Sequence, residues 1–364
     1  LQLPPQPTTT AADLLARVGV TDPPERCVCL HMWPSGSQAW LKEWPAAHWD
    51  ALIRRLAERG FRVCLTGGPR DATRVTAFLR EHPDCPAVSL AGTGSLSDLA
   101  CLFAHIAAVV AVNTGTMHLA AGLGVPSLAL FLATAPPWDT GPYLPACCCL
   151  EPALDCHPCP YNRPCPHNLE CHERISPAVA GALALSWCRT GRWEDAPLAR
   201  NGGEVRIWLS RRDVGGFMDL RDLAGREGED RSLWMRQQRH FWRHILDDMD
   251  RPVPSPLPPC PVTACSPPFA HEVGAALEQA VTLLQAIAAQ GALTGKSPRA
   301  GALLLRNCER LQNLLNGCPP LAALGGFWRE LRQARGDDIA EFLQFSGKLA
   351  VYLEQWRQKL QGLA

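Results

Sequence analysis

The sequence predicts an α/β protein with a doubly wound, Rossmann-like parallel sheet, a Cys-rich segment and a C-terminal α-helical bundle. Short apolar runs alternate with stretches of helical periodicity from residue 26 onward. The run at 107–113, AAVVAVN, is apolar almost throughout, which is typical of a parallel strand covered on both faces. Beyond a Pro-rich stretch at 251–268 the pattern is helical to the end.

The individual elements follow from apolar spacing and from turn signals. Gly60 is placed to end one helix, and Ser95 with Asp98 three residues later is typical of a capped helix start. Right-handed crossovers between successive strands then give a parallel sheet. The expected strands are 27–33, 61–69, 87–92, 107–113 and 126–133, and the expected helices are 46–60, 71–82, 95–106 and 114–124.

Composition shifts divide the chain into five segments. The first is Pro/Thr-rich and is expected to be a leader or the remnant of a missing N-terminal domain. The last should hold three amphipathic helices, around 271–291, 301–315 and 337–361. The segments are 1–25 (leader), 26–200 (Rossmann-like domain with a Cys-rich segment, 147–171), 201–250 (strand plus amphipathic helix), 251–268 (linker) and 269–364 (bundle).

Charge and hydropathy exclude several classes of partner. The 364 residues carry a formal net charge of zero, so nothing indicates bulk electrostatic binding to nucleic acid. No uncharged apolar run approaches the ~20 residues that a membrane span requires, and no signal peptide is expected. Several of the 17 cysteines, such as Cys64, Cys101 and Cys308, lie singly in predicted strands and helices, where a thiol behaves as a small hydrophobe. This usage indicates a reducing, cytoplasmic location with one local metal site.

An anion site is predicted where the strand at 107–113 runs into the next helix. Asn113 and Thr114 can cap that helix, and Gly115 lets a ligand approach the backbone. The free N–H groups and the positive end of the helix dipole favour a phosphate, to which His118 could donate. The alternative is an ordinary capped turn with a surface histidine.

Two further loops should reach the same edge of the sheet, because ligands of doubly wound sheets bind at the carboxyl ends of the strands. Lys42, in the Gly/Ser loop that contains Ser37, could neutralise a diphosphate leaving group without a catalytic metal. Asp71, after the turn that contains Gly68, could reach a ribose hydroxyl. The alternatives are a solvated lysine and a helix-capping aspartate.

Four cysteines have spacings that suit a metal: Cys156-x2-Cys159-x5-Cys165-x5-Cys171. Four thiolates on short Pro-rich loops can form the tetrahedral site that zinc or mononuclear iron occupies. Disulfides and free thiols are the alternatives.

The helix expected at 231–244 carries basic side chains between aromatic ones. This pattern could bind an acceptor but is more typical of an ordinary amphipathic helix.

The order of these motifs resembles glycosyltransferase family 9, the lipopolysaccharide heptosyltransferase group. The similar run, within about 26–180, is H-x-W…K-E-W-P…L-x-x-R-G-x-x-V-x-L-T-G-G-P…L-A-G…V-x-N-T-G-T-M-H-L-A-A-G-L-G-V-P. The resemblance implies the C-terminal, donor-binding half of a GT-B fold and a nucleotide-diphosphate sugar such as ADP-heptose as donor. It places the diphosphate on Lys42 and Thr114-Gly115, with His118 beside it. It also places Asp71 near the ribose and Met117 near the nucleotide.

The chain departs from that family in three ways. Asn113 stands where the family has Asp, the loop that holds Ser37 is longer, and no acceptor domain precedes the motifs. The general base would come from that missing half, so it is unknown here.

The expected function is metal-independent, inverting transfer of heptose to a lipopolysaccharide-type, lipid-linked or protein acceptor. The protein is expected to act at the inner face of a bacterial inner membrane, with which it could associate peripherally. The alternative is a non-catalytic nucleotide-sugar-binding module or subunit. Dinucleotide binding is disfavoured, because no G-x-G-x-x-G follows a strand.

Overall fold

The computed structural model describes residues 10–36, 38–159, 164–193, 203–293, 297–335 and 338–362. The chain divides into two compact units, Leu1–Arg226 and Glu227–Ala364. The division precedes the helix at 230–248, so this helix belongs to the helical unit. The boundary therefore differs from the one expected at the Pro-rich stretch 251–268.

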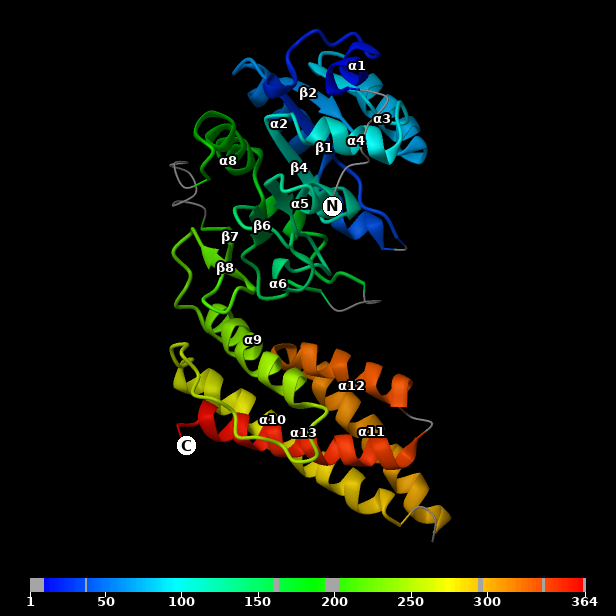
Figure 1. Cartoon of the computed structure of the whole chain (residues 1–364), viewed down its shortest axis with the longest axis vertical. Helices are drawn as coiled ribbons and strands as arrows, with labels where there is room; N and C mark the ends of the chain where they lie inside the picture. The colour runs from blue at the N-terminus through cyan, green and yellow to red at the C-terminus, as the bar shows by residue number, and fades with distance from the viewer. Residues whose placement is uncertain are drawn as a thin grey trace. The chain divides into compact units, whose positions relative to one another are not determined.

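A single sheet organises the described part of the first unit (Figure 1). Its order is β3-β2-β1-β4-β5-β6-β7-β8, with parallel pairing from β3 to β6 and antiparallel pairing of β7 and β8. This confirms the predicted α/β class and its mostly parallel sheet. The strands are β1 (Cys27–His31), β2 (Arg62–Leu65), β3 (Ala87–Ser89), β4 (Ala108–Val112), β5 (Ser127–Leu130), β6 (Cys148–Pro152), β7 (Val205–Arg212) and β8 (Met218–Asp222).

The strand order reverses between β1 and β4. The chain runs outward from β1 to β3, then returns to pair β4 with the other side of β1, with His31 opposite Ala111. The loops after β1 and β4 therefore leave the sheet side by side and in opposite directions. Such a switch point is where doubly wound sheets bind ligands.

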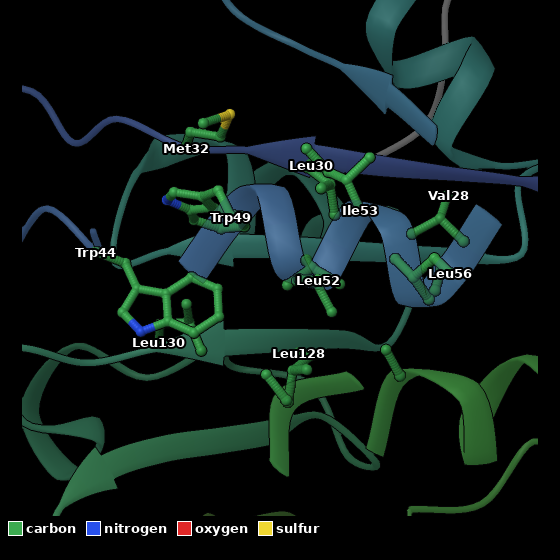
Figure 2. Packing of buried hydrophobic residues seen from close by; sticks show 14 of the residues in the cluster. Val28, Leu30, Met32, Trp44, Trp49, Leu52, Ile53, Leu56, Leu128 and Leu130 are labelled. Carbon is green, nitrogen blue, oxygen red and sulfur yellow. The ribbon is translucent and has the colours of Figure 1, made fainter. Parts of the chain in front are cut away.

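Helices bury both faces of the sheet, which explains why β1 and β4 are apolar along their whole length. On one face, Trp49, Leu52, Ile53 and Leu56 of α2 pack in the cluster that holds Val28 and Leu30 of β1, as Figure 2 shows. On the other face, Cys27 and Cys29 lie in a buried cluster with residues of helices α1 and α4. Each such side chain contributes about 1.5–3 kcal/mol when it is fully buried.

The first unit's remaining elements agree with the expected pattern in part. Leu14 and Leu15 of α1 are buried in the core, so residues 11–16 are integral to this unit rather than a detached leader. Ser95 and Asp98 form the capping box predicted at the start of α4. The elements are α1 (Ala11–Ala16), η1 (Pro24–Arg26), η2 (Ala39–Lys42), α2 (Ala46–Ala57), α3 (Pro69–Glu81), α4 (Leu96–Phe103), α5 (Gly115–Gly122), α6 (Pro137–Thr140), α7 (Cys171–Arg174) and α8 (Pro177–Thr190).

The second unit is a helical bundle with its own aromatic core. Trp234 of α9 stacks on Trp356 of α13 with ring centroids 5.0 Å apart, and Phe241 lies beside them. The aromatic face of α9 is therefore packing, as in an ordinary amphipathic helix. Its helices are α9 (Asp230–Asp248), α10 (Pro267–Gly291), α11 (Pro298–Gly317), η5 (Pro319–Leu321), α12 (Ala322–Arg335) and α13 (Ile339–Leu360).

Helix α12 is additional to the three helices expected after the linker, and Asp337, where the third was expected to begin, lies outside the described residues. Among the described residues, no helix combines the length and apolar character needed to cross a membrane.

Candidate donor-phosphate site

Lys42 is the last residue of η2, in the loop that leaves β1 at the switch point. It is half-buried, and desolvation lowers the pKa of its amine. It forms no ion pair with any carboxylate in the described parts of the chain; its neighbour Glu43 instead pairs with Arg74 at 2.8 Å. A partly desolvated cation with no carboxylate partner is suited to an external anion. Ser37, predicted in the same loop, lies outside the described residues.

The start of α5 supplies the second part of the site. Thr114 is its N-cap in an extended conformation and makes no side-chain capping bond. Asn113 does not cap the helix either, because its amide donates to the Thr140 hydroxyl at 2.6 Å. The first N–H groups of α5, near exposed Gly115, are therefore not covered by a capping side chain. His118 is exposed one turn further along.

Met117 differs from its predicted role. Its side chain is fully buried with Phe131, Cys149 and Trp208 in a cluster beside the sheet. In this position it packs against the core and has no surface to offer a nucleotide. The helical spacing could not reveal which residue of this short apolar helix faces inward.

The contacts of Asp71 also differ from those expected. Its carboxylate accepts the N–H of Gly68 at 2.9 Å and completes the capping box of α3. A Cβ on the adjacent Gly67 would lie 2.5 Å from the Asp71 Cβ, so this turn needs glycine. Asp71 is thus a capping residue, which was the alternative, and Gly68 contributes its N–H to that cap.

His31 begins the H-x-W run of the sequence but was not among the predicted site residues. It ends β1 and is buried at 8% exposure, and desolvation lowers the pKa of its imidazole. Its Nδ1 lies 3.5 Å from the Thr66 hydroxyl, which donates to the Leu30 carbonyl. The sequence signal that could have identified His31 is a polar residue at the end of an otherwise apolar strand.

The four predicted metal ligands lie in one neighbourhood. The negative charges of Cys171, Cys156 and Cys165 add to desolvation in raising the pKa of the Cys159 thiol to about 11. Within the parts of the chain that the structure describes, however, no three His, Cys, Asp or Glu side chains are placed to hold a metal ion. The same parts of the chain contain these four cysteines as free thiols.

A buried polar contact fastens this Cys-rich segment to the sheet. His157, between Cys156 and Cys159, lies 3.4 Å from the carboxyl of Glu151 on β6, and both side chains are at most 1% exposed. The Trp208 indole donates to the same carboxyl at 3.0 Å. Cys159 adds a backbone bond to the Ala133 carbonyl at 2.8 Å.

A cavity of about 760 Å³ lies elsewhere, in the helical unit. Acidic residues around the start of α9 and the chain at 263–266 line it, and none of the predicted site residues does.

Comparison with known proteins agrees with this geometry. The family model described as "Glycosyltransferase family 9 (heptosyltransferase)" matches residues 24–167, which hold η2, the α3 turn and the start of α5. Residues 24–167 are thus similar to this family. The matched segment contains every predicted donor-binding residue.

The curated relatives also match only part of the chain. The chain is 40% identical over 122 residues to "Lipopolysaccharide heptosyltransferase 1" of Pseudomonas aeruginosa, covering 32% of each chain. It is 36% identical over 100 residues to "Lipooligosaccharide heptosyltransferase 2" of Haemophilus ducreyi, covering 26% of this chain and 29% of the relative. The chain thus spans about a third of the length of these relatives. Among solved structures, "Structure of E. coli ADP-heptose lps heptosyltransferase II" is 25% identical with a TM-score of 0.32, covering 39% of this chain and 44% of that one.

Proposed function

We propose that this chain supplies the donor-binding part of a glycosyltransferase that transfers heptose from a nucleotide-diphosphate sugar such as ADP-heptose. The observation that carries the proposal is half-buried Lys42, without a carboxylate partner, at the same sheet edge as the uncapped start of α5. A cation and a helix N-terminus together suit a diphosphate. The related family 9 segment supports this assignment.

The proposed reaction is a single displacement at the anomeric carbon. The acceptor oxygen forms a bond to that carbon while the bond to the diphosphate oxygen breaks, which inverts the configuration. Lys42 and the N–H groups of Gly115 and Thr116 stabilise the negative charge that develops on the departing diphosphate, in place of a metal ion. The base that accepts the proton of the acceptor hydroxyl is assigned to no residue of this chain.

The acceptor would be a lipopolysaccharide-type or other lipid-linked glycan, or a protein, reached at the cytoplasmic face of the inner membrane by peripheral association. The curated relatives named as lipopolysaccharide heptosyltransferases support this choice.

Direct titration with nucleotides tests the donor site. ADP, UDP and GDP are titrated into wild type, Lys42→Ala and the control Lys359→Ala, whose lysine lies on α13 of the other unit. A charge-assisted hydrogen bond contributes about 1.5–3 kcal/mol, so Lys42→Ala should weaken the preferred diphosphate roughly 10- to 100-fold while the control leaves it unchanged. Binding of none of the three nucleotides, or equal affinity of wild type and Lys42→Ala, would refute the proposal.

A second candidate function is a nucleotide-sugar-binding module without catalysis. Asn113, at the position where the family has Asp, favours it, because any step that requires a carboxylate there is lost. The chain is therefore assayed together with an acceptor-binding domain that supplies the general base, with ADP-heptose and lipopolysaccharide acceptor. Transfer that is lost in Lys42→Ala supports the enzyme, whereas nucleotide binding by the chain without transfer in this reconstituted assay supports the module.

We also propose that Cys156, Cys159, Cys165 and Cys171 hold a structural zinc or iron ion. The spacing of the four cysteines on short Pro-rich loops supports this proposal, and binding would require the four thiols to come closer together than they lie in this structure. In this role the four thiolates would tie the segment after α6 to the sheet through the anchor at His157. The ion would take no part in the transfer.

A further inference from the structure

The chain around α7 makes three contacts with the Lys42 loop and the start of α2 that follows it. His172 Nε2 lies 2.7 Å from the carbonyl oxygen of Leu41, 131 residues away in the sequence. The Trp44 indole donates to the Ile175 carbonyl at 2.8 Å in a buried position. The third contact joins His48 Nε2 to the Glu173 carboxylate at 3.1 Å.

The three contacts hold different parts of the chain in place. Trp44 precedes α2 by two residues and His48 lies in its first turn, and Trp44 packs in the core of the sheet at 3% exposure. The contact of His172 is to the peptide group that joins Leu41 to Lys42. Because a peptide group is planar, fixing the Leu41 carbonyl also fixes the direction in which the chain enters Lys42.

Lys42 depends on this support more than a paired lysine would. Its amine has no ion-pair partner among the described residues that could hold it in place. It lies in a single 3-10 turn of four residues, whose closing bond from Glu43 N–H to the Trp40 carbonyl is long, at 3.5 Å. A 3-10 turn of this length has little stability of its own. Its geometry must therefore come from tertiary contacts.

From this geometry we propose that His172 is a positioning residue for Lys42, holding the Leu41 carbonyl so that the lysine amine faces a bound diphosphate. The imidazole acts as hydrogen-bond donor through Nε2, which requires an N–H at that atom. The proposal rests on the proposed function, since it assumes that Lys42 contacts the diphosphate. The residue that follows the Cys-rich segment would therefore affect donor binding directly.

The test combines His172→Leu, His172→Gln and Lys42→Ala. Gln can place an N–H near the position of Nε2, whereas Leu fills similar space without a donor. His172→Leu should weaken ADP, or whichever diphosphate wild type binds best, about fivefold, which corresponds to one hydrogen bond. The affinity for the free nucleoside should stay unchanged, and His172→Gln should restore most of the loss.

The double variant separates positioning from general damage. In Lys42→Ala, the further change His172→Leu should cost no additional affinity, because the two residues act as one unit. Additive losses, equal loss for diphosphate and nucleoside, or no loss at all would overturn the proposal. Thermal unfolding of each variant shows whether the first unit stays folded.

A readout without ligand distinguishes failure of this inference from failure of the proposed function. Lysine amines are reductively ¹³C-methylated, and the Lys42 signal is titrated by NMR with Lys348 as reference. His172→Leu should move the lowered pKa of Lys42 back toward its ordinary value, since the amine becomes more solvated. An unchanged Lys42 titration overturns the positioning role whether or not nucleotides bind. If wild type binds no nucleotide but the titration moves, only the proposed function fails.

Discussion

Replacement of Glu151 by alanine should destabilise the first unit by about 3–5 kcal/mol. The carboxyl is completely buried on β6 and accepts the Trp208 indole N–H at 3.0 Å, with His157 Nδ1 at 3.4 Å. Alanine removes the acceptor that Glu151 gives the Trp208 indole and takes the carboxyl away from a buried imidazole. It also leaves a cavity between β6, β7 and the Cys-rich segment. Each of these changes lowers the free energy of unfolding of the first unit.

Urea unfolding followed by tryptophan fluorescence measures the loss, with Glu151→Gln and Glu81→Ala as comparisons. Glutamine keeps an acceptor for Trp208 and similar volume, so it should cost less, about 1–2 kcal/mol. Glu81 is exposed at the end of α3, and its replacement should change stability by less than about 0.5 kcal/mol. If Glu151→Ala unfolds at the same urea concentration as Glu81→Ala, the buried pair does not anchor the segment and the reasoning is refuted.

Three further predictions concern single side chains. Asp71→Ala removes the cap of α3 and should cost about 1 kcal/mol in urea unfolding, with nucleotide affinity unchanged; a severalfold loss of affinity would instead return Asp71 to the ribose. Although desolvation opposes it, hydrogen bonds from Ser255 and Tyr352 lower the pKa of Asp248 to about 2. Because the folded pKa lies below the unfolded value, this contribution to stability is complete above about pH 4 and disappears as the pH falls through 2, so the stability difference between wild type and Asp248→Asn should shrink between pH 6 and pH 2.5. Elemental analysis should find about one zinc or iron ion per chain in wild type and less in Cys159→Ser, with Cys188→Ser, from helix α8, retaining the ion; a metal-free wild type purified under reducing conditions would contradict the metal site.

The sequence predicted the elements whose signals are local. Strands β1 to β5 are apolar runs between turn residues, and the capping box at Ser95 is complete within four residues. Strand β6 was missed because its cysteines, Cys148 and Cys149, can be either reactive thiols or small hydrophobic residues. Their complete burial, which raises the pKa of both thiols, assigns them to the core. Helix α12 was missed because Gly325-Gly326 interrupt an otherwise helical pattern.

The candidate site could be predicted only as far as the chain order of its parts. Lys42 and the start of α5 follow strands that a doubly wound topology brings together, so a general rule was sufficient. The contact of His172 with Leu41 joins residues 131 positions apart, and no periodicity or capping pattern encodes it. Asp71 had two uses that the sequence could not separate, because a carboxylate three residues after Gly68 suits a cap and a ligand equally well.

The structure also gives a physical reason why Asn113 can replace a carboxylate at this edge. The Thr140 hydroxyl is directed toward the Pro136 carbonyl at 3.5 Å, so it is available to accept the Asn113 amide N–H at 2.6 Å. A carboxylate could not donate in this way and would bring a negative charge next to the start of α5. In the proposed site, Asn113 is neutral and leaves Lys42 as the charged group that would face a diphosphate. Asn113 would therefore favour retention of the anion, whereas a carboxylate would favour its release by like-charge repulsion.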